Sequence, residues 1–167
     1  AENRWQPLLQ AGINIDPALM RYQYPRGAGC YDAAVAPSRT ECIYLCQGGF
    51  VYVSLDRGKS WRRTTLPYYD GYGANSGSRA TNERLAVDPV NHLIVGIGNP
   101  DMGARGGLHI SFDGGDSWAA HPQIPAPSAP DRGMAIAFDP DSGSNGERTR
   151  LVYIWSYGHG IFRSISG

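Results

Sequence analysis

The stretch Ser111-Phe112-Asp113-Gly114-Gly115-Asp116-Ser117-Trp118 decides the fold, because it also occurs earlier in the chain as Ser54-Leu55-Asp56-Arg57-Gly58-Lys59-Ser60-Trp61. Both copies follow the pattern S-x-D-x-G-x-S-W. The Asp carboxylate can accept hydrogen bonds from backbone amides of its own turn, the glycine supplies a positive φ, and the Trp ring can pack back over the hairpin. The pattern predicts a structural turn between two strands, built by Ser54, Asp56, Gly58 and Trp61 in one copy and by Ser111, Asp113, Gly115 and Trp118 in the other.

A longer repeat surrounds these turns. Segments 34–37, 86–89 and 137–140 end in prolines that lie 52 and then 51 residues apart. Short apolar runs follow at 42–45, 93–97 and 151–155, and glycine-led alternating strands follow at 49–54, 107–111 and 160–164. Each unit is therefore expected to form four short strands, A to D, with strand D beginning at the tryptophan. Four strands in about 50 residues are typical of a β-propeller blade, and a β-sandwich is the alternative.

The repeat also predicts how the chain is organised. Residues 1–167 are expected to form one all-β propeller segment, with N-terminal strand 3–10 completing a blade. The blade equivalents are roughly 12–66, 80–124 and 132–167. Propellers typically have about four to eight blades, so this chain alone is not expected to close a ring. Completion by further chain or by other subunits is expected.

Composition excludes several classes of protein. The 22 glycines, 12 prolines and 11% aromatic residues indicate a folded, turn-rich chain. Fifteen basic residues balance fifteen acidic ones, so no nucleic-acid partner is expected. The longest apolar runs are far shorter than the roughly 20 residues of a membrane-spanning helix, so no such helix is expected. No targeting segment is expected at the start of the given sequence, and a processed chain would look the same. No cofactor and no metal site is expected.

The turn resembles the Asp-box of sialidases, sortilin-type receptors and xyloglucan-degrading endoglucanases. The endoglucanases are the most similar, because Glu83-Arg84-Leu85-Ala86-Val87-Asp88-Pro89, a strand, Gly-Leu-x-x-Ser and the turn follow one another as in a blade of that family. The segment Asp131-Arg132-Gly133-Met134-Ala135 resembles the family as well. This resemblance implies an early portion of a long extracellular enzyme with two propellers.

The chemistry of that family is not fully present in this chain. The resemblance implies two carboxylates acting as general acid and base, one of which precedes a Gly-Gly pair by two residues. Here Cys46 occupies that position before Gly48-Gly49, and the second acid belongs to a propeller that this chain does not contain. The chain is therefore not expected to hydrolyse polysaccharide by itself. Within this chain, Asp70 and Asp101 are the acidic pair that could act as general acid and base.

In a propeller the D–A and B–C loops open on one face, and polar and aromatic residues gather there. Tyrosine rings stack on pyranose faces, while amides, carboxylates and arginine bond hydroxyl groups, so these loops suit a sugar. The alternative is that they serve loop packing. The ligand-binding candidates are Tyr68, Tyr69, Asp70, Tyr72, Arg79, Asn99, Asp101, Arg105, Tyr157 and His159.

Three cysteines lie close together in the first repeat. A Cys30–Cys46 disulfide across strands A and B would indicate an oxidising compartment, extracellular or periplasmic. The alternative is three small buried apolar side chains, Cys42 included.

Two functions stay open at this point. One is a carbohydrate-binding, glycosidase-like propeller portion. The other is a non-enzymatic propeller that docks a protein partner through its incomplete ring and exposed strand edges.

Overall fold

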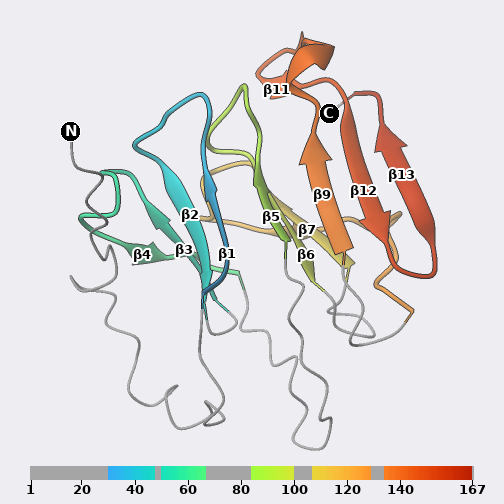
Figure 1. Ribbon diagram of the computed structural model, residues 1–167, viewed down its shortest axis with the longest axis horizontal. Helices are drawn as coiled ribbons and strands as arrows, with labels where there is room; N and C mark the ends of the chain where they lie inside the picture. The colour runs from blue at the N-terminus through green and yellow to red at the C-terminus, as the bar shows by residue number, and fades with distance from the viewer. Residues whose placement is uncertain (1–29, 48–49, 67–83, 100–106, 129–133, 167) are drawn as a thin grey trace, which may run out of the picture.

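The computed structural model describes residues 30–47, 50–66, 84–99, 107–128 and 134–166. These residues form antiparallel sheets that follow one another along the chain and lie side by side (Figure 1). The all-β fold class, a portion of a β-propeller whose ring this chain does not close, is confirmed.

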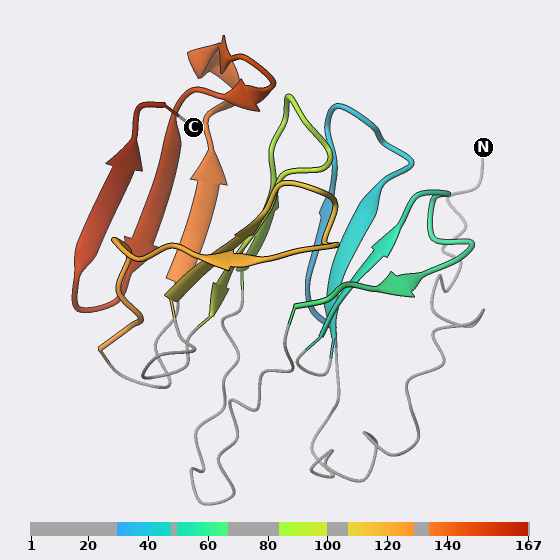
Figure 2. The ribbon, with the colours of Figure 1, turned by 180° about the vertical axis from the view of Figure 1, so that it is seen from behind.

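The first two sheets have the same four-stranded order. In the first, the order is β1 (Cys30–Val35), β2 (Ile43–Gln47), β3 (Phe50–Ser54) and β4 (Arg62–Arg63). In the second, it is β5 (Arg84–Val87), β6 (Val95–Asn99), β7 (Gly107–Ser111) and β8 (Ala119–Ala120). From behind, the short strands β4 and β8 cross in front of the longer ones (Figure 2).

The third sheet has three strands among the described residues. Strand β12 (Val152–Ser156) pairs with β9 (Met134–Phe138) on one side and with β13 (Gly160–Ser164) on the other. A 3-10 helix (Pro140–Ser142) and a hairpin of β10 (Ser144–Asn145) and β11 (Arg148–Thr149) lie between β9 and β12. Sequence reasoning did not predict this hairpin.

Most of the core consists of two apolar layers between successive sheets, because strand alternation sends every second side chain to each face. A third, smaller cluster of Leu45 and Tyr52 with Trp61 lies on the other face of the first sheet. The first layer joins the first and second sheets and includes Tyr44, Val51, Leu85 and Val95. The second layer joins the second and third sheets and contains Leu108, Ile124, Met134, Ile136, Val152 and Ile154. Each sheet is therefore held by burial against its neighbour.

Two glycines bring the second and third sheets close together. A Cβ on Gly98 would lie 2.6 Å from the Met134 Cβ, and one on Gly96 would overlap the Ile136 Cδ1. Both glycines lie on β6, opposite the third sheet. Because glycine has no side chain, the backbone of β6 can approach the third sheet this closely.

Candidate functional site

The end of the sheets where strands β2, β6 and β12 finish is the predicted ligand-binding end. Tyr157 and His159 lie there, in the turn between β12 and β13 (Figure 1). Asn99 ends β6, and its side chain lies outside the described residues. The other candidates also lie outside them: Tyr68, Tyr69, Asp70, Tyr72, Arg79, Asp101 and Arg105.

The turn between β12 and β13 presents two side chains to solvent. Tyr157 is 36% exposed, and His159 is exposed as well. The turn is closed by a hydrogen bond of 3.0 Å from His159 N to Ser156 O. An exposed tyrosine ring and an imidazole separated by one glycine can offer a stacking surface and a hydrogen-bonding group to one ligand.

A segment following the second sheet anchors this turn. Ser128 N and Ser128 Oγ both donate to Tyr157 O, at 3.0 and 3.3 Å, and Ser156 Oγ donates to Pro125 O at 2.9 Å. Gly158 has a φ of +81°, and a Cβ there would lie 2.7 Å from the Ser128 Cβ. The glycine is therefore required both for the backbone conformation and for the contact with Ser128.

Trp155 adds a contact that sequence reasoning missed. Its ring meets that of Tyr157 edge to face, with 6.2 Å between centroids and an interplanar angle of 81°. Trp155 is 41% exposed on the face of β12 that points away from the second sheet. The signal that could have found it is the alternation of Tyr153 and Trp155 on one side of a strand that leads directly to Tyr157.

The two repeated turns lie at the opposite end of the sheets, beside the A–B turns. Gly114 N donates to Leu93 O at 2.8 Å, and Arg57 N donates to Glu41 O at 2.9 Å. Each C–D turn is thus bonded to the A–B turn of its own repeat. The turns are separated from the Tyr157 end by the length of the strands.

Both aspartates of these turns are saturated by local hydrogen bonds. Asp56 accepts bonds from Ser54 Oγ at 2.8 Å, Ser60 N at 2.8 Å and Ser60 Oγ at 2.6 Å. Asp113 has the same donors in Ser111 and Ser117, at 2.8, 2.8 and 2.5 Å. These bonds, chiefly the one from the Ser60 or Ser117 hydroxyl, lower the pKa of both carboxyl groups to about 2. A carboxylate held in this way stabilises the turn.

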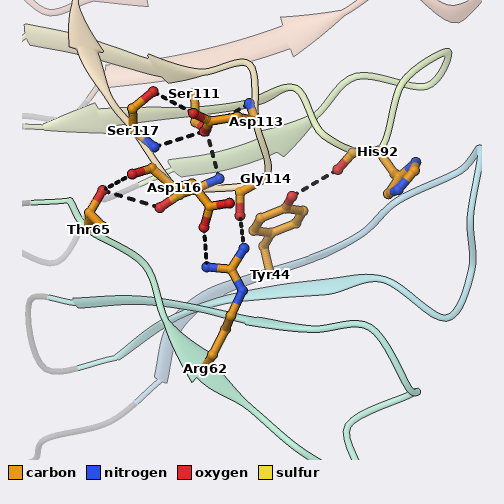
Figure 3. Close-up of polar contacts among 10 residues, drawn as sticks. Tyr44, Arg62, Thr65, His92, Ser111, Asp113, Gly114, Asp116 and Ser117 are labelled. Atoms are coloured by element: carbon orange, nitrogen blue, oxygen red, sulfur yellow. Dashed lines mark hydrogen bonds and ion pairs between the residues drawn. The ribbon is translucent and has the colours of Figure 1, made fainter.

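The second of these turns also joins two sheets (Figure 3). Arg62 from β4 pairs with Asp116 at 2.9 Å and donates to Gly114 O at 2.9 Å, while Thr65 Oγ1 donates to Asp116 O at 2.7 Å. Nearby, the Tyr44 hydroxyl donates to His92 O at 2.8 Å. Burial raises the pKa of the Tyr44 hydroxyl, so it stays protonated as a donor.

The cysteines are placed as follows. Cys42 is a free buried thiol, and burial raises its pKa. Cys46 is 1% exposed in the first core layer, directly opposite Asp32 on β1, while Cys30 lies opposite Gln47 after an irregularity in the register. The Cys30 side chain lies outside the described residues, so the Cys30–Cys46 disulfide stays a prediction.

Two absences hold for the part of the chain that the structure describes. It contains no cluster of three or more His, Cys, Asp or Glu side chains arranged to hold a metal ion. It also contains no helix with the length and hydropathy needed to cross a membrane.

The fold and the turns define the class of protein, a portion of a β-propeller. Comparison with known proteins refines this class. No family model matches the chain. The chain is 28% identical over 188 residues to a xyloglucanase of Paenibacillus sp, which covers 98% of this chain and 18% of that protein. It is 30% identical over 149 residues to an oligoxyloglucan-reducing end-specific xyloglucanase of Emericella nidulans, covering 84% of this chain and 17% of that protein.

Solved structures point to the same enzymes. The crystal structure of a GH74 xyloglucanase from Xanthomonas campestris matches with a TM-score of 0.62 and 28% identity, over 83% of this chain and 22% of that one. The chain is thus similar to xyloglucanases along nearly its whole length. It spans about a fifth of the length of the relatives it matches.

Proposed function

We propose that this chain is a polysaccharide-binding portion of a xyloglucanase-like propeller, and that it contacts a β-glucan chain such as xyloglucan at the Tyr157 end of its sheets. The observation that carries the proposal is the exposed Tyr157 ring beside His159, at the end predicted to bind sugar, in a chain similar to xyloglucanases. The remaining predicted ligand residues belong to the same proposal.

The turn geometry favours stacking on a sugar. Edge contact with Trp155 limits the tilt of the Tyr157 ring, and the two Ser128 hydrogen bonds fix the backbone beneath it. A ring ordered before binding loses little conformational entropy when a pyranose stacks on it. His159 can then exchange hydrogen bonds with sugar hydroxyl groups.

We also propose that this chain alone does not hydrolyse xyloglucan. Cys46, at the position matched to one family acid, is buried between the first and second sheets, so its thiol is not exposed to solvent at the Tyr157 end. A thiol in an apolar layer cannot donate a proton to a glycosidic oxygen in solvent. Reducing sugar released from xyloglucan by the purified chain, and not by a mock preparation, would refute this part.

Binding is tested with a matched pair of tyrosine variants. Tyr157→Ala is expected to weaken retention of the chain on soluble xyloglucan, measured by affinity electrophoresis, by about tenfold because one stacking contact is lost. Tyr153→Ala is the control, since Tyr153 is 37% exposed and lies on the sheet face rather than in the turn. Equal retention of both variants, or no retention of the unmodified chain on any β-glucan, contradicts the proposal.

The second candidate is a non-enzymatic module that docks a protein. The observation that favours it is the exposed apolar side of the third sheet, where Tyr153, Trp155 and Ile161 are 37%, 41% and 74% exposed. Docking of a protein there, without xyloglucan binding at the Tyr157 end, would favour this candidate. The extracellular or periplasmic location stays a prediction.

A further inference from the structure

Asp32 lies at the Tyr157 end of the sheets, although sequence reasoning did not select it. It stands near the start of β1, directly opposite Cys46 near the end of β2, and β2 finishes at that end (Figure 1). The residue is half-buried, so part of it is open to solvent. A carboxylate is therefore present at the end where we propose that sugar binds.

Two backbone amides hold this carboxylate in place. Asp32 Oδ2 accepts from Leu85 N, on β5 of the second sheet, at 2.7 Å. Asp32 Oδ1 accepts from Ala33 N at 2.9 Å. A carboxylate has about four acceptor sites, so a group held by these amides can accept hydroxyl donors as well. Because its direction is set before a ligand arrives, little conformational entropy is lost on binding.

The repeat does not require an acid at this position. The equivalent residues are Arg84 in the second sheet and Ala135 in the third, since each pairs with the next-to-last residue of the strand beside it, as Asp32 does. Arginine has no hydrogen-bond acceptor and alanine has no polar side chain, so neither can accept from an amide of the next sheet. The acid of the first sheet therefore indicates a role beyond packing.

The backbone is also irregular at this residue. The register of β1 against β2 shifts between Cys30 and Asp32. In the second sheet, by contrast, Arg84 and Leu85 pair with successive residues of β6. An irregularity of this kind re-aims a side chain and is common beside the functional sites of β proteins.

We infer that Asp32 is a further ligand-binding residue of the Tyr157 end, whose carboxylate accepts hydrogen bonds from hydroxyl groups of a neutral polysaccharide. The inference rests on the proposed function and adds the chemical class of the ligand. A charged acceptor bonds hydroxyl groups more strongly than a neutral one, and it repels carboxylates of an acidic polysaccharide. Asp32 therefore contributes both affinity and a preference for uncharged glucan.

Isothermal titration with soluble xyloglucan and with carboxymethyl cellulose, an acidic β-glucan, tests the inference. Asp32→Asn keeps an oxygen that can accept from Leu85 N but removes the charge. It is expected to bind xyloglucan about tenfold more weakly, because the sugar hydroxyl loses a charged acceptor. Its affinity for carboxymethyl cellulose should fall less, since the repulsion between carboxylates is removed as well. A residue that only supports the fold would change both affinities together.

Two further variants serve as controls. Asp32→Glu keeps the charge, so it should keep the preference for xyloglucan over carboxymethyl cellulose. Asp139→Asn is the matched control, because Asp139 is half-buried at the opposite end and accepts from Asp141 N at 3.1 Å. It should leave both affinities unchanged. Thermal unfolding checks that each variant is folded.

The contrary outcomes separate this inference from the proposed function. Xyloglucan binding by the unmodified chain, with an unchanged preference in Asp32→Asn, overturns the inference and leaves the proposed function intact. An equal change in Asp139→Asn overturns it too, because the effect then belongs to net charge. If Asp32→Asn does not fold, loss of the preference in Asp32→Glu overturns it. If the unmodified chain binds neither polymer, the proposed function itself fails, and this inference fails with it.

Discussion

Asp88 and Thr149 are joined by two hydrogen bonds, from Thr149 N at 2.8 Å and from Thr149 Oγ1 at 2.6 Å. Both residues are buried, and they come from different repeats. The Asp88 carboxylate also accepts from Val90 N at 2.7 Å within its own A–B turn. One buried carboxylate therefore ties the second sheet to the β10–β11 hairpin of the third.

Removing this carboxylate should destabilise the chain strongly. Asp88→Ala is expected to lower the free energy of unfolding by on the order of 3 kcal/mol, because the buried Thr149 donors lose their acceptor. Urea unfolding followed by tryptophan fluorescence measures this. Asp139→Ala is the matched control, since Asp139 holds the equivalent position and accepts from Asp141 N at 3.1 Å. An equal loss in both variants would contradict this account of Asp88.

The folded chain should become less stable in acid because the two turn aspartates become protonated. Their folded pKa of about 2 lies below the ordinary 3.8, so the stability they contribute is present above pH 4 and is lost as the pH falls through 2. Removing the principal hydrogen bond with Ser60→Ala and Ser117→Ala should shift this loss to higher pH. Thermal unfolding from pH 6 to pH 2 measures the shift. Ser60→Thr with Ser117→Thr keeps both hydroxyls and should behave like the unmodified chain.

Two glycines of the Tyr157 turn should differ in their tolerance of alanine. Gly158 and Gly160 both have positive φ, but only Gly158 faces Ser128, while nothing lies within 4 Å of a Cβ on Gly160. Gly160→Ala is expected to cost about 1 kcal/mol of unfolding free energy, and Gly158→Ala about 1–3 kcal/mol more. Ser128→Gly should recover part of the Gly158→Ala loss. Equal melting temperatures for the two alanine variants would contradict the contact.

The close approach of the second and third sheets should make Gly98 less tolerant than Gly96. A Cβ on Gly98 meets the Met134 Cβ, which moves only with its backbone, whereas one on Gly96 meets the flexible end of Ile136. Gly98→Ala is expected to cost about 3 kcal/mol and Gly96→Ala about 1 kcal/mol in unfolding free energy. Ile136→Val should rescue only Gly96→Ala. If Ile136→Val restored the stability of both alanine variants in chemical denaturation, Met134 would not be the residue that limits Gly98.

The repeat predicted which segments form strands, but it was less accurate about the residue at which each strand begins. Apolar runs beginning at Cys42 and Leu93 became strands beginning at Ile43 and Val95. The reason is that buried turn residues are apolar too. Cys42 N donates to Arg39 O at 2.8 Å and Ile94 N to Asn91 O at 3.0 Å, so both close the A–B turn before the strand begins.

The β10–β11 hairpin was missed because it lies in a polar stretch without alternation. Its signal is Gly146, the first of the two turn residues between Asn145 and Arg148, where a two-residue hairpin turn favours glycine; its φ is +63°. The bond from Thr149 to Asp88 could not be predicted, since it depends on how two repeats pack. At the candidate site, the sequence suggested Tyr157 and His159, but the supporting ring of Trp155 depends on strand direction and side-chain rotamer.

The glycine pair on β6 has a consequence for the order of the sheets. Sequence similarity makes the three repeats look like interchangeable units, yet Gly96 and Gly98 stand where the third sheet has Tyr153 and Trp155. In a chain with the second and third repeats exchanged, the Tyr44 ring of the first sheet would meet Met134 and Ile136, which in this structure meet the bare backbone of Gly98 and Gly96. The propeller portion is therefore a directional series, in which the outer faces of the first and second sheets each fit the sheet that follows.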